Sequence, residues 1–176
     1  MKPSSIAVFC GSKNGNNNLF AEHTGKLGKL LAENDVTLVY GGGNKGLMGI
    51  VANAVLENGG KVVGIIPELL NSWERQHNGL TELIVVENMH VRKRMLYERA
   101  DAAIILPGGF GTMDELFEIL TWNQLSIHDK PVYILNTDGF YDALLHHMQK
   151  MMDENFLYNP VNQVINVLST PEELFH

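Results

Sequence analysis

The stretch from residue 102 to residue 115 constrains this chain most, because a buried strand there runs directly into a glycine-rich loop. Residues 102–106 form a short apolar run, and Pro107 ends it because proline has no backbone N–H to donate to a sheet. Glycine, which lacks a Cβ, adopts left-handed backbone angles and lets another group approach the amides closely. The glycines of this loop are Gly108, Gly109 and Gly111. The pattern predicts a loop built around a ligand.

A helix is expected to begin at Thr112, directly after this loop. Thr112 and Glu115 have the T-x-x-E spacing of a capping box, in which each side chain bonds the backbone amide of the other residue. A strand, a glycine loop and a helix N-terminus together form an anion site, because unpaired N–H groups and the positive end of the helix dipole point at one place. The carboxylate of Glu115 beside such a terminus is expected to be favoured as the anion.

The rest of the chain alternates between short apolar runs and amphipathic segments. Strands are expected at residues 6–10, 36–40, 61–66, 83–87, 102–106, 131–135 and 164–167. Helices are expected at residues 20–33, 47–57, 90–99, 112–127 and 140–152 and from Pro171. Residues 69–80 should be irregular or weakly helical, and part of this segment should line the site or move. This alternation predicts an α/β protein: a Rossmann-like, doubly wound parallel sheet with helices on both faces, in one domain over residues 1–176.

Two further turns are expected at the carboxyl ends of strands, where such sheets bind ligands. One contains Gly11 and Ser12, and the other begins with Gly41, Gly42 and Gly43. Residues 41–46 also satisfy the dinucleotide pattern G-x-G-x-x-G. We discount a dinucleotide, because this loop follows the second strand rather than the first. A single nucleotide shared between both glycine loops fits better.

Charge and composition exclude several classes of protein. The formal net charge is −7, which argues against a nucleic-acid partner held through its phosphates. Arg92, Lys93, Arg94 and Arg99 nevertheless cluster, as expected either of a solvated helix face or of a local pocket for a small anion. The neighbouring anion loop favours the pocket.

The sequence also lacks the signals of membranes, disulfides and metals. No apolar run approaches the ~20 residues that span a bilayer, and the N-terminus has no signal-peptide core, so we expect a cytoplasmic protein without a membrane partner. Cys10 is the single cysteine and is most simply a small buried hydrophobe. The seven histidines show no metal-ligand spacing, and we expect neither a metal nor a cofactor.

Three motifs carry a resemblance to a known family. PGGFGTMDE, at residues 107–115, resembles the PGGxGTxxE signature of the LOG ("Lonely guy") family of phosphoribohydrolases, often labelled "putative lysine decarboxylase". MHVRK at residues 89–93 resembles the family's MHxRK, and residues 121–131 resemble its TWxQLGIHxKP, with Ser126 in place of the usual glycine. The resemblance covers nearly the whole chain, up to about residue 160.

The resemblance implies a substrate, a reaction and a set of site residues. The family cleaves the N-glycosidic bond of cytokinin nucleotides, so the expected substrate is a purine nucleoside 5′-monophosphate, such as AMP or an N6-substituted AMP. By resemblance, Arg92 and Glu115 are the catalytic residues. The expected substrate-binding residues are Ser12, Gly42, Gly43, Glu74, Arg92, Lys93, Gly108, Gly109, Phe110, Gly111, Thr112, Glu115 and Thr121. Family members are typically homodimers with the site near the interface.

Two other functions remain open from the sequence. A nucleotide carrier or sensor on the same fold, similar to molybdenum cofactor carrier proteins, would have the glycine loops but would need no catalytic carboxylate. The pairing of Glu115 with Arg92 therefore favours the hydrolase. A dinucleotide-dependent oxidoreductase is a third possibility, which binding of a nicotinamide cofactor would reveal.

Overall fold

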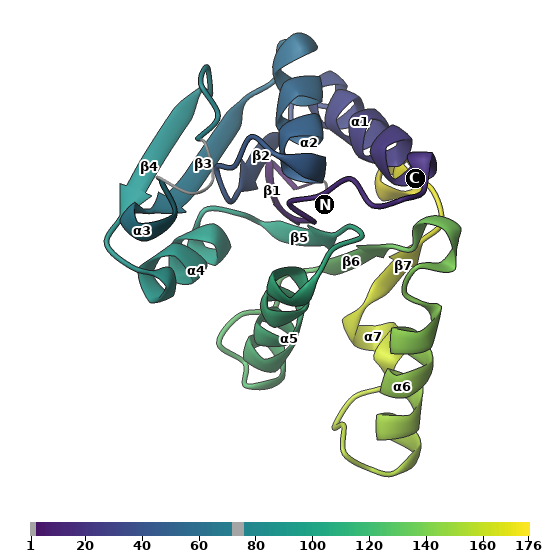
Figure 1. Ribbon diagram of the computed structural model, residues 1–176. Coiled ribbons are helices and arrows are strands. Elements are labelled where there is room, and N and C mark those ends of the chain that lie inside the picture. The colour runs from purple at the N-terminus through teal and green to yellow at the C-terminus, as the bar shows by residue number, and fades with distance from the viewer. Residues whose placement is uncertain (1–2, 72–75) are drawn as a thin grey trace.

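The computed structural model describes residues 3–71 and 76–176, and within them seven parallel strands form one sheet with helices on both faces (Figure 1). The strands are β1 (Ser5–Phe9), β2 (Thr37–Tyr40), β3 (Val62–Pro67), β4 (Glu82–Val86), β5 (Ala102–Ile105), β6 (Val132–Leu135) and β7 (Asn166–Leu168). The α-helices are α1 (Asn18–Glu33), α2 (Gly46–Glu57), α3 (Glu68–Asn71), α4 (Met89–Glu98), α5 (Phe110–Gln124), α6 (Asp142–Asp153) and α7 (Val161–Val164). Two 3₁₀ helices, η1 (Thr137–Gly139) and η2 (Pro171–Phe175), complete the described elements.

The order of the strands places a topological switch at the middle of the sheet. The order is β4-β3-β2-β1-β5-β6-β7, and every pairing is parallel. The chain therefore winds outward from β1 to β4, returns to the centre and adds β5 on the other side of β1. This arrangement confirms the predicted doubly wound α/β fold. Ligands bind such sheets where the winding direction reverses, which here is between β1 and β5.

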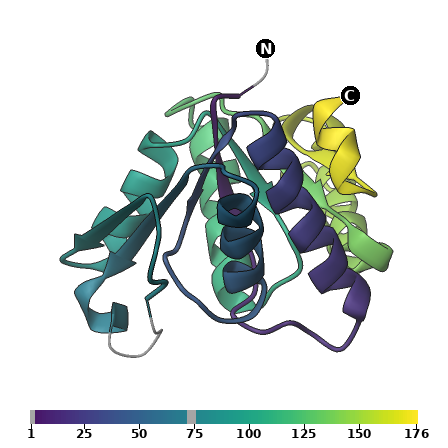
Figure 2. The same cartoon turned by 90° about the horizontal axis from the view of Figure 1, so that it is seen from above.

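Each central strand is buried on both faces, as the continuous apolar runs predicted. Ile6 and Val8 of β1 belong to the core beneath α1 and α2, whereas Ala7 and Phe9 belong to the core beneath α4, α5 and α6. The two views show these two groups of helices on opposite sides of the sheet (Figures 1 and 2).

The predicted elements agree with the structure to within a few residues, except near the end of the chain. We expected a strand at residues 164–167, but Val164 ends the short helix α7 and β7 begins at Asn166. The helical turn forms because Pro160 precedes it with φ −57° and because the Ile165 amide donates to the Val161 carbonyl at 2.9 Å. Among the described residues, no helix is long and apolar enough to cross a bilayer.

Two glycines of α1 make a matched test of how closely α1 packs on α2. A Cβ at Gly28 would lie 2.7 Å from Ala54 Cβ and 2.7 Å from the Val51 carbonyl oxygen, both in α2. At Gly25, one turn earlier, the nearest atom would be Ile50 Cγ2 at 3.8 Å. Alanine in a helix interior is otherwise favoured over glycine by about 0.5–1 kcal/mol.

We therefore expect the two alanine variants to change stability in opposite directions. Gly28→Ala should lower the free energy of unfolding by about 1–3 kcal/mol, because the added methyl group forces the helices apart. Gly25→Ala should raise it by up to about 1 kcal/mol. Urea denaturation followed by circular dichroism measures both variants. Equal stabilisation by the two substitutions would contradict the close packing.

Candidate active site

The loops that follow β1, β2 and β5 surround a cavity of about 250 Å³ at the carboxyl edge of the sheet. The cavity adjoins the switch between β1 and β5, where the fold predicts a ligand. Of the site residues expected from the sequence, it brings together Ser12, Arg92, Gly109, Phe110, Gly111, Thr112 and Glu115. These residues come from three separate segments of the chain, so the fold assembles the site.

Helix α5 begins earlier than the sequence suggested. Gly109 is its N-cap and no side chain caps it, so the predicted capping box of Thr112 and Glu115 is wrong. The Met113 amide already donates to the Gly109 carbonyl at 3.1 Å, which places Thr112 inside the first turn. The amides of residues 110–112 therefore precede the first intrahelical bond of α5 and face its open end, where an anion binds.

The three glycines of the loop have different roles. None of them has a positive φ, so our expectation of left-handed backbone angles is wrong for this loop. A Cβ at Gly108 would lie 2.1 Å from Thr112 Oγ1 and 3.0 Å from the Gly11 amide, so Gly108 permits close packing within the protein. A Cβ at Gly109 or Gly111 would meet no atom within 4 Å, which leaves open space beside the amides at the start of α5.

Among the described residues, main-chain carbonyls and not a carboxylate hold Arg92. Its side chain, in α4, is only 8% exposed. Nε donates to the Ile65 carbonyl at 3.1 Å, Nη2 donates to the Gly41 carbonyl at 3.4 Å, and Nη1 lies 3.8 Å from Met89 Sδ. These two bonds use one N–H each, so the other N–H groups of the guanidinium remain on the edge that carries Nη1.

Glu115 lies about one turn after Thr112 in α5, and it lines the same cavity as Arg92. Burial raises the pKa of its carboxyl group to about 7, although the charges of Arg92 and Lys93 oppose the rise. Our expectation that the helix terminus would favour the anion is therefore wrong. Glu115 is six residues past Gly109, beyond the first turn where the dipole acts. Near pH 7 it can accept or release a proton.

The main chain of Glu115 is hydrogen-bonded to the neighbouring helix α4. The Tyr97 hydroxyl donates to the Glu115 carbonyl at 2.8 Å, which ties α5 to α4. Among the described residues, the carboxyl oxygens have no hydrogen bond or ion pair, so they are free to meet a substrate.

Lys93 does not line the cavity, although it follows Arg92 in the sequence. Its ammonium group lies 2.6 Å from an Asp114 carboxylate oxygen and 3.5 Å from one of Glu118. Lys93 therefore joins α4 to α5 beside the site, and its charge acts on Glu115 without touching the cavity.

Four other expected site residues, Gly42, Gly43, Gly108 and Thr121, do not line this cavity, and Glu74 falls outside the described residues. Gly42 has φ +77° and its carbonyl accepts a hydrogen bond from the His77 amide at 3.1 Å, while Gly43 forms a bridge with Gln76. Both shape the loop after β2, and the site cavity is lined by Gly41 instead.

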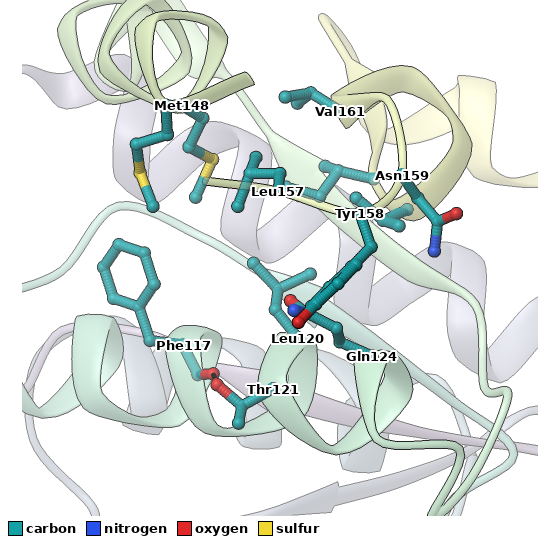
Figure 3. A pocket seen from close by; sticks show the side chains of 12 residues that line it. Phe117, Leu120, Thr121, Gln124, Met148, Leu157, Tyr158, Asn159 and Val161 are labelled. Carbon is teal, nitrogen blue, oxygen red and sulfur yellow. Dashed lines mark hydrogen bonds between the residues drawn. The ribbon is translucent and has the colours of Figure 1, made fainter. Parts of the chain in front are cut away.

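Thr121 lies two turns beyond the site on α5. Its hydroxyl donates to the Phe117 carbonyl at 2.7 Å. It lines a separate apolar pocket of about 130 Å³, in which Phe117 and Leu120 of α5 face Met148 of α6 (Figure 3). Within a single chain, Thr121 therefore does not reach the cavity that contains Glu115.

Sequence reasoning missed several residues around the site. Cys10, Met48, Met89 and Asp114 also line the cavity. Burial raises the pKa of the Cys10 thiol well above its usual range, so it stays protonated and unreactive. Among the described residues, no three His, Cys, Asp or Glu side chains are grouped to hold a metal ion.

A second cavity, of about 360 Å³, adjoins the first and shares Gly11, Ser12 and Gly109 with it. Lys13 and Asn14 line this cavity, and their position directly after the Gly11–Ser12 turn could have revealed them. Phe140 also lines it, but it comes from the connection between β6 and α6, and no local signal in the sequence points to that contact.

Comparison with known proteins identifies the family. Residues 48–176 match a family model described as "Possible lysine decarboxylase". The chain is 46% identical over 171 residues to "Probable cytokinin riboside 5'-monophosphate phosphoribohydrolase LOG6" of Arabidopsis thaliana, covering 97% of this chain and 85% of that protein. It is 45% identical over 156 residues to the cytokinin riboside 5'-monophosphate phosphoribohydrolase of Rhodococcoides fascians, covering 88% and 79% of the two chains. The chain belongs to the LOG family.

Solved structures agree with this LOG-family fold. The molybdenum cofactor binding protein of Rippkaea orientalis matches with a TM-score of 0.72 at 23% identity, covering 98% of this chain and 92% of that one. The Moco carrier protein of Chlamydomonas reinhardtii matches with a TM-score of 0.71 at 19% identity, covering 97% and 91%. At such identities the likeness establishes the shared fold alone.

The electrostatics of this LOG-family site predict how Glu115 titrates. We expect its carboxyl group to titrate near pH 7 rather than near the ordinary value of 4.5. Arg92→Gln should raise this pKa further, because it removes the positive charge that favours the carboxylate. The measurement is a pH titration of the labelled Glu115 carboxyl carbon by NMR.

The exposed Lys45 provides a control for this titration. Lys45→Gln removes a positive charge that contributes nothing to the pKa of Glu115, and should leave the midpoint unchanged. A wild-type midpoint near 4.5 would contradict the dominance of burial.

Proposed function

We propose that this chain hydrolyses the N-glycosidic bond of a purine nucleoside 5′-monophosphate, giving the free base and ribose 5-phosphate. One observation carries the proposal: the unpaired Glu115 carboxyl group and the fixed Arg92 guanidinium face one cavity beside the N-terminus of α5. The names of the relatives from Arabidopsis thaliana and Rhodococcoides fascians support the same reaction.

The 5′-phosphate binds at the start of α5. The amides of Phe110, Gly111 and Thr112 offer hydrogen-bond donors at the positive end of the helix, and the open space at Gly109 and Gly111 lets phosphate oxygens approach them. Binding energy from this non-reacting group holds the ribose in one position. That energy is used at the reacting carbon, where correct placement lowers the barrier.

Glu115 acts on the anomeric carbon, C1′. As the C–N bond lengthens, positive charge develops on the ribose, and a carboxylate beside it stabilises that charge or removes a proton from the attacking water, as in other glycoside hydrolyses. Water gives its oxygen to C1′, and the departing base retains the bonding electrons and gains a proton. The carboxylate is the active form, so activity requires the proton of Glu115 to be lost.

Arg92 assists the departing base. Its charge is permanent, and its orientation is fixed by the Ile65 and Gly41 carbonyls. The exposed edge of the guanidinium can donate one hydrogen bond to a ring nitrogen as negative charge develops there. A preorganised donor of this kind stabilises the transition state without any rearrangement of its own.

The first experiment is incubation of the purified protein with AMP and with N6-isopentenyl-AMP, followed by chromatography of the released base. Glu115→Gln should lower kcat by on the order of 10³-fold while nucleotide binding survives, because the variant keeps the shape of the side chain and loses its charge. Glu118→Gln, one turn along the same helix, is the matched control and should keep near-normal turnover. Unchanged kcat in Glu115→Gln would refute the mechanism.

We further propose that the chain forms a homodimer through α5 and the segment after α6, which brings the interface close to the site. Large apolar side chains on this surface lie exposed in the single chain: Phe110 (96%), Phe117 (40%), Leu125 (64%), Phe156 (76%) and Tyr158 (84%). Exposed apolar side chains that gather on one surface mark an interface. Phe110 also lines the site cavity, so a second copy over this surface would lie beside it.

Light scattering tests the dimer. The wild-type protein should show twice the chain mass of 19.6 kDa, and Phe117→Glu should show the monomer, because it buries a charge in the interface. Val85→Glu, an equally exposed position on edge strand β4, should remain a dimer. A monomeric wild type would overturn this proposal.

A further inference from the structure

Gly41 lies at the end of β2, against the guanidinium group of Arg92. A Cβ at Gly41 would lie 2.1 Å from Arg92 Nη2 and 3.3 Å from its Cζ. No real Cβ tolerates the shorter distance, so any side chain at this position must displace the guanidinium. The φ of Gly41 is not positive, so other residues could adopt its backbone conformation. Glycine is needed here because it has no side chain.

Two main-chain carbonyls define where the guanidinium sits. Gly41 directly follows β2 and Ile65 lies in the neighbouring strand β3, and their carbonyl oxygens accept hydrogen bonds from Nη2 at 3.4 Å and from Nε at 3.1 Å. The guanidinium therefore lies against Gly41, between the residue that follows β2 and the middle of β3. Nη1 is left at the edge beside Met89.

A larger residue at position 41 would change Arg92 but hardly change the fold. The group in the way is the far end of a long, flexible side chain, which can swing into the adjoining cavity of about 250 Å³. The next nearest atom, Met48 Sδ at 3.6 Å, is at an ordinary contact distance. The backbone angles of Gly41 also suit alanine.

The last glycine of the same loop behaves differently. Gly46 has φ +59°, and a Cβ there would lie 2.3 Å from the Lys13 amide nitrogen and 2.3 Å from the Ser12 carbonyl carbon. Backbone atoms cannot move aside as a side chain can, so Gly46 supports the loop after β1. In a dinucleotide-binding loop the second glycine lets the backbone approach a pyrophosphate. Here Gly41 and Gly46 make room for the protein's own atoms.

We infer that Gly41 is a positioning residue for catalysis, because its missing side chain lets the Arg92 guanidinium lie against the Gly41 and Ile65 carbonyls. The inference rests on the proposed hydrolysis of a nucleoside monophosphate, in which Arg92 assists the leaving base. In this role Gly41 needs no contact with the substrate. This role also explains why the loop resembles a nucleotide-binding motif without serving as one.

The test is a double-mutant cycle between positions 41 and 92, measured by release of adenine from AMP. Gly41→Ala should lower kcat on the order of 10²-fold, because misplacing a catalytic group by about 1 Å costs that much. The KM and the thermal midpoint should stay near the wild-type values. In an Arg92→Ala background, the same substitution should change kcat by less than about twofold, because the group it displaces is already gone.

Gly25→Ala, in α1 and away from the site cavity, is the matched control and should leave kcat unchanged. A second readout does not depend on activity: the Arg92 Nε–H proton, seen by NMR in isotope-labelled protein, should exchange slowly in the wild type and rapidly in Gly41→Ala. If the wild type releases no base, the proposed function fails while this readout still tests the placement of Arg92. Wild-type kcat in Gly41→Ala, a slowly exchanging Nε–H in that variant, or an equal loss of kcat in both backgrounds would overturn the inference.

Discussion

The hydrogen-bonded seam between β1 and β5 is the constraint on which the rest of the site depends. Phe9 pairs with Ile105, the Leu106 amide donates to the Phe9 carbonyl at 2.9 Å, and the Gly11 amide donates to the Pro107 carbonyl at 3.0 Å. The two strands end side by side, but the chain leaves β1 toward α1 on one face of the sheet and leaves β5 toward α5 on the other. The crevice that opens between them receives the N-terminus of α5, and with it Glu115.

A second feature of the site is that its two charged groups do not neutralise each other. Arg92 is satisfied by main-chain carbonyls, so its guanidinium needs no carboxylate partner. Glu115 in turn has no ion pair within the part of the chain that the structure describes, and burial raises its pKa to about 7 even though Arg92 and Lys93 act in the opposite direction. A carboxyl group that titrates near neutral pH suits a proton-transfer or charge-stabilising role better than a structural one.

The sequence predicted the fold because each strand and helix carries its own local signal, while the site depends on contacts that cross the chain. The T-x-x-E pattern of Thr112 and Glu115 obeyed a local rule, yet the N-cap is the extended Gly109, three residues before Thr112. The pKa of Glu115 depends on the strands that bury it, and the role of Gly41 depends on Arg92, 51 residues later. Neither could be inferred from a neighbouring residue.

The most direct measurement is a crystal structure of the Glu115→Gln variant with AMP bound. The phosphate should accept hydrogen bonds from the amides at the start of α5, C1′ should face Gln at position 115, and the base should lie beside the Arg92 edge. A phosphate bound at residues 41–46, or a nucleotide in the pocket between α5 and α6, would contradict this arrangement of the site.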